Sequence, residues 1–240
     1  MAAIAVNSDT GFSKLLSSLT EDTVTASIHW RLYKDLRAAV PEFQREMNQS
    51  AAFWSLTLNA HREVAMFRLS RLYDQQRGAL SLASLVETIR ANQHLFDEAS
   101  FRERLKDNPF VDGLAKDARR PDSATLDSDA RSVVESDTLV ERLVAIRNRV
   151  LAHRDPRVVL GASDDPAAAL AAVDVDTLLA RAATVVNRYG ILFRAGSHLM
   201  RIVGHDDFRS VLRHVRSDLV ATEREINEEI ARANLAKDAG

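Results

Sequence analysis

Residues 41–73 read PEFQREMNQSAAFWSLTLNAHREVAMFRLSRLY, and their periodicity indicates the fold class. Pro41 suits the first turn of a helix, where its missing N–H costs nothing. Apolar residues then recur at helical spacing in two stripes. The first contains Met47, Ala51, Trp54, Leu58 and Ala65, and the second contains Phe53, Leu56, Ala60, Val64 and Phe67. A helix that is apolar on two faces is typical of the centre of a bundle. We therefore expect one long central helix from Pro41 to Tyr73.

The sequence on both sides of this segment is helical in pattern as well. Further helices are expected over 21–39, 98–106, 130–152, 176–195 and 206–233. Another helix is expected to begin after Ser81, which is its N-cap. Exposed connections are expected over 107–129 and 161–174. No alternation typical of a strand is present. The sequence predicts an all-α bundle formed by a single domain over residues 1–240, with a core at about 21–200 and a C-terminal helical extension at about 205–235.

The composition narrows the classes of function. The chain has 240 residues, and the absence of Cys excludes disulfides, Cys-ligated zinc and a thiol nucleophile. We expect no membrane span, no secretory signal and a cytoplasmic location. The net charge of −2 is not that of a strongly basic nucleic-acid coat protein. However, five of the 32 basic residues are Lys and the others are Arg, whose planar guanidinium binds phosphate in a bidentate manner.

Several common site patterns are absent, namely the Walker loop, Gly-x-Gly-x-x-Gly, His-Glu-x-x-His and Gly-x-Ser-x-Gly. The segment Asp174-Val175-Asp176 resembles a metal-binding pair of carboxylates. A loop Asp followed by Asp176 as the N-cap of a helix explains the segment better. The seven His residues show no zinc-ligand spacing. We expect no metal and no cofactor.

Residues 146–155, IRNRVLAHRD, stand apart from the rest of the chain. Six positions separate Arg147 from His153, which corresponds to about 9 Å along a helix and about 120° around it. Both side chains could still converge on one phosphate group. His153 lies close to the extension of an apolar stripe, and the helix dipole and the neighbouring Arg residues shift its pKa in opposite directions. The stripe consists of Leu139, Leu143, Ile146 and Val150.

The spacing of Arg and His is informative only together with the Asn. A loose Arg-x(4–6)-His pattern should arise about twice by chance in this composition, and it also occurs at Arg209–His214. The stricter pattern Arg-Asn-x4-His has a chance expectation of roughly 0.03. An ordinary Arg-rich helix end with a capping His is the alternative interpretation of residues 147–153.

Residues 147–153, RNRVLAH, resemble the signature of the HEPN superfamily, and most closely that of its abortive-infection type U branch. Residues 69–74, LSRLYD, followed by Gly78 and by residues 80–82, LSL, resemble the segment after the long second helix of that branch. The resemblance covers roughly residues 25–195. It implies a HEPN-like helical bundle with additional C-terminal helices, and a homodimer formed through the helix that carries the motif.

The resemblance also implies an endoribonuclease that needs no metal. His153 would transfer a proton while the ribose 2′-oxygen attacks phosphorus, Arg147 would bind the phosphate and stabilise its developing charge, and Asn148 would orient the pair. Weaker candidates for substrate binding are Arg149, Arg154, Arg71 and Asp74. An Arg–Asp pair three positions apart near a helix end is more often structural.

These observations predict an RNA-cleaving protein of phage defence or a toxin, with RNA as substrate and an antitoxin as a further partner. Two alternatives come from other classes, because possession of a motif does not establish turnover. The first is a non-catalytic helical module that binds RNA or a nucleotide in the same cleft. The second is a protein-interaction scaffold that uses the mixed-charge helix over residues 223–232.

Overall fold

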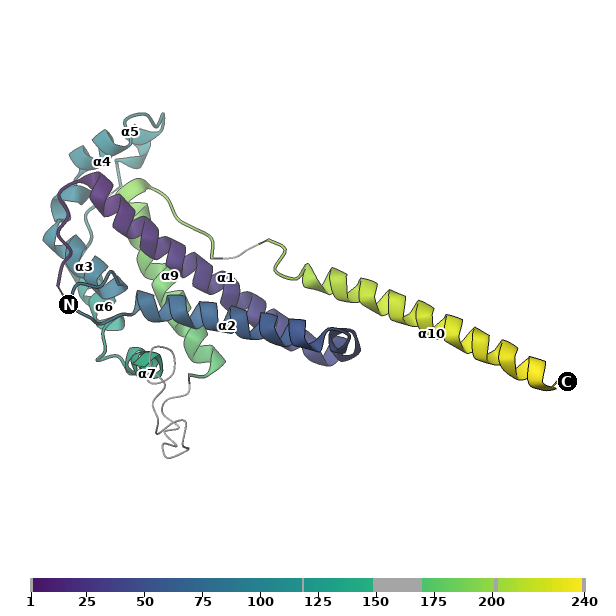
Figure 1. Cartoon of the computed structure of the whole chain (residues 1–240). Helices are drawn as coiled ribbons and strands as arrows, with labels where there is room; N and C mark the ends of the chain where they lie inside the picture. Colours follow the sequence, from purple (N-terminus) through teal and green to yellow (C-terminus); the bar gives the residue numbers. More distant parts are fainter. Residues whose placement is uncertain (1, 118, 149–169, 201–202, 239–240) are drawn as a thin grey trace. The chain divides into compact units, whose positions relative to one another are not determined.

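The computed structural model describes residues 2–117, 119–148, 170–200 and 203–238, and these residues form helices and no strand (Figure 1). This confirms the all-α prediction. Among the described helices, none has both the length and the apolar character needed to cross a bilayer. The elements are α1 (Asp9–Asn48), α2 (Ala51–Leu72), α3 (Leu82–Ala91), the 3-10 helix η1 (Gln93–Phe96), α4 (Glu98–Arg104), α5 (Val111–Leu114), α6 (Ser123–Ser132), α7 (Thr138–Ile146), α9 (Ala172–Arg194) and α10 (Phe208–Asp238).

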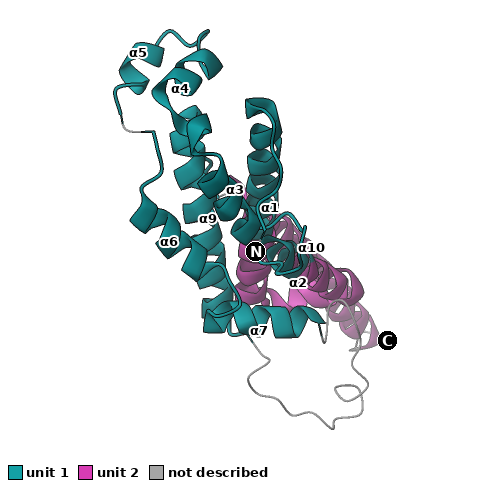
Figure 2. Cartoon of the chain, turned by 90° about the vertical axis from the view of Figure 1, so that its left-hand side faces the viewer, with its two compact units in different colours: residues 1–28, 64–201 teal, residues 29–63, 202–240 magenta. Residues whose placement is uncertain are grey.

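The chain forms two compact units (Figure 2). Unit 1 comprises residues 1–28 and 64–201. Within it, α9 contacts α3, η1, α4 and α7. At one end of this core the Phe12 ring lies 4.7 Å from the Phe193 ring and 5.5 Å from the Phe96 ring, measured between centroids. Aromatic rings at such distances interact favourably beyond the area that they bury.

Unit 2 comprises residues 29–63 and 202–240. Its core joins the second half of α1 to the first turns of α10, where Leu212 is fully buried. The α1 residues in this cluster are Leu36, Ala39, Phe43 and Met47. Residues 220–237 of α10 are exposed throughout. The single domain expected from the sequence, with its core and C-terminal extension, remains a prediction.

The expected helix from Pro41 to Tyr73 is wrong. Pro41 lies inside α1, and the chain bends at Phe43, whose φ of −120° and ψ of 24° are not helical. Proline lacks the N–H of a helical hydrogen bond, so an internal proline is commonly accompanied by a kink. The helix ends at Asn48, and α2 begins after Ser50, whose carbonyl accepts from the N–H of Trp54 at 3.2 Å.

The central position expected for this segment is also wrong. The α2 helix buries one face, with Ala65, Met66, Leu69 and Leu72. On its second stripe Phe53, Leu56 and Phe67 are 60%, 69% and 57% exposed. Periodicity reports which side chains share a face, and it does not report whether another element covers that face.

Two unrecognised N-caps account for the differences farther along the chain. Asp122 accepts N–H bonds from the first turn of α6, within a region expected to be an exposed connection. The expected helix over 130–152 is interrupted after Ser132, and Asp137 caps α7. An Asp at the N-cap satisfies N–H groups that lack a partner within the helix. The prediction for the α3 helix is confirmed, since Ser81 is its N-cap and accepts from the N–H of Ser84.

Candidate functional site

The turn after α2 is anchored on both sides of Asp74. Tyr73 is 1% exposed, and its hydroxyl donates to the carbonyl of Leu178 in α9 at 2.7 Å. Burial raises the pKa of this phenol far above its usual value, so Tyr73 remains a hydrogen-bond donor. Gln75 Nε2 donates to the carbonyl of Val133 at 3.0 Å. These two bonds define the position of the backbone on either side of Asp74.

Asp74 brings this turn to the motif. Its Oδ1 accepts from the N–H of Gln76 at 2.9 Å and lies 2.6 Å from Nη1 of Arg147. The side chains of Asp74 and Arg147 are 22% and 16% exposed, so the ion pair is largely shielded from water. An ion pair in such surroundings is stronger than one on the open surface, because water and salt screen it less.

Helix α7 presents Arg147 at its C-terminal end. Asp137 accepts from the N–H of Leu139 at 3.0 Å and begins the helix. Packing holds it in place, since Val140, Leu143 and Val144 are buried. The N–H of Arg147 still donates to carbonyls of the last helical turn. Its guanidinium Nε donates to Oδ1 of Asn148 at 3.1 Å.

Three residues proposed from the sequence therefore lie together, namely Arg147, Asn148 and Asp74. Arg71 does not join them through an ion pair with Asp74, because its Nε lies 3.4 Å from Oδ2 of Asp22. The remaining candidates, His153, Arg149 and Arg154, lie outside the residues that the structure describes.

Asp22 is a residue that the sequence analysis missed. Its side chain is only 6% exposed, and its carboxylate binds Nη1 of Arg68 and the guanidinium of Arg71. A buried carboxylate is stable only when it is paired or hydrogen-bonded. The signal was present in the sequence, because Asp22 follows Leu19 by three positions and precedes Ala26 by four, and both of these are buried. A charge on the apolar face of a helix predicts a charged partner nearby.

This arrangement suits phosphate binding. The Arg147 bonds to Asp74 and Asn148 use Nη1 and Nε, and the amino group at Nη2 takes part in neither. A guanidinium held by these two contacts is preorganised, which lowers the entropic cost of binding an anion through its remaining N–H donors. Among the described residues, no group of three or more His, Asp or Glu side chains is placed to hold a metal ion.

The structure also resolves the Asp174-Val175-Asp176 segment. Helix α9 begins at Ala172, and Asp174 Oδ2 accepts from the N–H of Ala171 at 3.0 Å and pairs with Arg142 at 2.9 Å. The N-cap assigned to Asp176 is therefore wrong by five positions, because Ala171 is the N-cap. Asp174 serves as a capping residue and an ion-pair partner.

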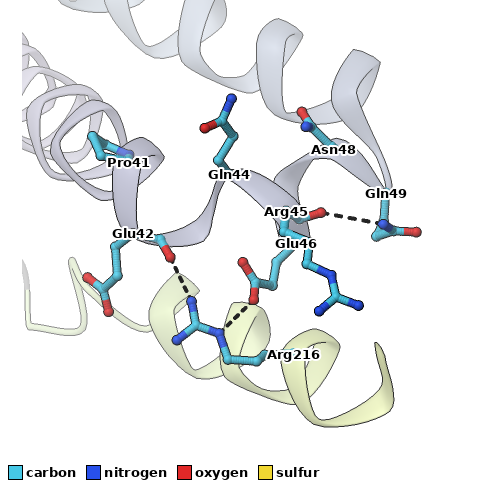
Figure 3. A pocket seen from close by; sticks show the side chains of 8 residues that line it. All are labelled: Pro41, Glu42, Gln44, Arg45, Glu46, Asn48, Gln49 and Arg216. Atoms are coloured by element: carbon cyan, nitrogen blue, oxygen red, sulfur yellow. Dashed lines mark hydrogen bonds and ion pairs between the residues drawn. The ribbon is translucent and has the colours of Figure 1, made fainter. Parts of the chain in front are cut away.

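A polar pocket of about 610 Å³ lies elsewhere, in unit 2 (Figure 3). It lies beside the bend of α1, and Arg216 of α10 forms one of its walls. Arg216 Nε donates to Glu46 at 2.6 Å, and its Nη2 donates to the carbonyl of Glu42 at 2.7 Å. The hydrogen bond from Arg216 holds the pKa of Glu46 below its usual value. These contacts join α1 to α10, and we assign the pocket a structural role.

Comparison with known families confirms the family resemblance. The model of the HEPN_AbiU2 family, described as AbiU2, matches residues 9–228. Searches of curated proteins and of solved structures found no significant match. The matched range includes α1, the Asp74 turn, α7 and most of α10.

Proposed function

Because the chain belongs to the AbiU2 family of HEPN domains, which is related to abortive infection, we propose that it is an endoribonuclease that requires no metal ion. The observation that carries the proposal is the placement of Arg147. Its guanidinium is held by Asp74 and Asn148 at the end of α7, directly before the remainder of the motif. Oriented donors aimed at a developing charge supply much of the rate of phosphoryl transfer.

The proposed reaction begins with attack of the ribose 2′-oxygen on the adjacent phosphorus. The P–O5′ bond breaks, so the products are a 2′,3′-cyclic phosphate and a 5′-hydroxyl. Arg147 binds the non-bridging oxygens and stabilises the charge that develops on them. His153, by its place in the motif, transfers the proton. Asn148 orients the Arg147 guanidinium, and Asp74 is a positioning residue that acts through the same guanidinium.

We further propose that two copies pair through α7, so that two sets of motif residues line one cleft. The support is the apolar stripe on this helix, in which Leu143 is buried whereas Leu139 and Ile146 are only half-buried. A two-fold contact would complete the burial of these side chains. Light scattering at micromolar concentration should report a dimer. A Leu139→Asp, Ile146→Asp variant should be monomeric, and a variant that remains dimeric would place the interface elsewhere.

An RNA cleavage assay in the presence of EDTA tests the activity. Wild-type protein should cleave RNA and leave 2′,3′-cyclic phosphate ends, whereas His153→Ala should cleave on the order of 100-fold more slowly. His214→Ala is the matched control, because His214 follows Arg209 in the loose pattern without the Asn and its Nδ1 bonds the Ser210 carbonyl of its own helix. If cleavage stops on chelation and returns with magnesium, metal independence is wrong. If His153→Ala cleaves like wild type while folded and dimeric, the catalytic proposal fails and the RNA-binding module takes its place.

A protein-binding role for α10 is favoured by a separate observation. Ile226, Ile230 and Leu235 are 49%, 54% and 71% exposed. In proteins most helical stability comes from packing of an apolar face rather than from intrinsic propensity. Deleting residues 221–240 separates the two functions, since RNA cleavage should persist while binding of a protein partner such as an antitoxin should be lost. Loss of RNA cleavage in the folded deletion variant would contradict this division.

A further inference from the structure

We propose that Phe67 and Arg71 bind an unpaired RNA base and its phosphate beside Arg147, which makes single-stranded RNA the substrate class. This inference rests on the proposed ribonuclease function and deepens it. Phe67 is 57% exposed although it is a large apolar side chain. The guanidinium carbon of Arg71 lies 6.0 Å from the centroid of its ring.

The two side chains lie on the face of α2 that leads to Asp74, which forms the ion pair with Arg147. Phe67 and Arg71 are four positions apart on α2, so they are neighbours on its surface. The N–H of Asp74 donates to the Arg71 carbonyl at 3.2 Å, which continues the chain by one turn toward the ion pair of Asp74 with Arg147. All of these residues belong to unit 1.

Arg71 is oriented and still accessible. Asp22 lies 3.4 Å from its Nε, while the Arg71 side chain is 50% exposed. Arg68 shares the same buried carboxylate. These ion pairs join three arginines, at positions 68, 71 and 147, to two carboxylates, at positions 22 and 74, so the group itself carries one more positive than negative charge. Such a surface complements a phosphate backbone.

The aromatic ring selects the form of the RNA. An exposed ring can stack on any unpaired base, because every base has a π-face, and guanidinium planes add to such stacks. In a duplex the base faces are covered by their neighbours and cannot reach Phe67. The combination of an exposed ring, a neighbouring arginine and the Arg147 phosphate ligand therefore favours single strands, loops or bulges over continuous duplex.

Fluorescence anisotropy with a uniformly 2′-O-methylated RNA tests the inference, because methylation removes the attacking hydroxyl and prevents cleavage. Wild-type protein should bind the single strand on the order of tenfold or more tightly than the matching duplex. Phe67→Ala should weaken single-strand binding on the order of tenfold or more, and Phe67→Trp should restore it. Phe53→Ala is the matched control on the same helix, since Phe53 is 60% exposed and has no part in the site. Arg71→Ala should reduce the slope of log affinity against log salt by about 1.

Three outcomes would overturn the inference. One is a Phe67→Ala variant that binds single strands like wild type, and another is wild-type protein that binds single strand and duplex equally. Dissociation of the dimer by Phe67→Ala in light scattering would instead assign the ring to a contact between two copies. Failure of the inference is distinguishable from failure of the proposed function. If wild type cleaves unmodified RNA and Phe67→Ala cleaves it equally well, only the stacking surface is wrong, whereas no cleavage by wild type would remove the ribonuclease proposal itself.

Discussion

The ion pair between Asp74 and Arg147 can be measured directly by a double-mutant cycle. Its atoms lie 2.6 Å apart, and its side chains are 22% and 16% exposed. Exposed pairs contribute about 0.2–1 kcal/mol, and removing one partner of a fully buried pair costs about 3–5 kcal/mol. This pair lies between the two limits, so we expect a coupling free energy of about 1–2 kcal/mol. The Asp74→Ala change alone should cost somewhat more, because the N–H of Gln76 also loses its acceptor.

The assay is urea unfolding of wild type, Asp74→Ala, Arg147→Ala and the double variant. The cycle removes the contribution of Gln76 from the coupling term, because Asp74→Ala eliminates that bond in both backgrounds. A change of 1–2 kcal/mol should lower the thermal midpoint by roughly 2–8 °C in a chain of this size. A coupling below about 0.3 kcal/mol would refute the argument that shielding from water strengthens the pair. RNA cleavage by Asp74→Asn should fall on the order of tenfold, because Arg147 loses its orientation.

Three further predictions concern the motif residues, the pair of His29 and His61, and the end of α9. In RNA binding and cleavage assays, Arg147→Ala should weaken both binding and cleavage, and Arg147→Lys should retain only part of each, because an ammonium lacks the bidentate fork. His153→Ala should lower cleavage on the order of 100-fold with little change in affinity. Burial, followed by the charge of His29, whose Nδ1 lies 2.9 Å from that of His61, holds the pKa of His61 below its usual 6.5. The unfolded chain then binds protons more readily, so this contribution to stability is complete above pH 6.5 and is lost as the pH falls toward the folded-state pKa. In a His61→Gln variant the thermal midpoint should therefore depend less on pH in that window. Ala195 ends α9 at a φ of 53°, a left-handed conformation that favours glycine, so Ala195→Gly should stabilise the protein by about 0.5–1 kcal/mol in urea unfolding, and an unchanged or lower stability would contradict this.

The local signals in the sequence predicted the helical class and several helix positions, but not all of the helix ends. Ser81 is predictable as an N-cap because an apolar periodic segment follows it directly, and α3 confirms it. Asp122 and Asp137 cap α6 and α7 in the same way. They lie among other Asp, Ser and Arg residues, where a cap cannot be distinguished from an exposed loop by composition. The sequence predicts Pro41 at the start of a helix, where proline is most easily accommodated. In α1 a bend at Phe43 accommodates it inside the helix instead.

The candidate site shows the same limit at the level of single charges. Sequence spacing proposed Arg71 and Asp74 as a pair, because residues three positions apart on a helix are neighbours. Each instead forms its ion pair with a residue far away in the chain, Arg71 with Asp22 and Asp74 with Arg147. The ion pair that forms is the one that packing makes available and shields from water, and Tyr73 and Gln75 determine that geometry through their bonds to Leu178 and Val133.

The Tyr73→Phe change should therefore make the Arg147 side chain less well positioned, although Tyr73 forms no bond with Arg147. Cleavage should fall in this variant more than its modest loss of stability explains, and a loss of stability with unchanged cleavage per folded molecule would show that the turn is not what positions the site.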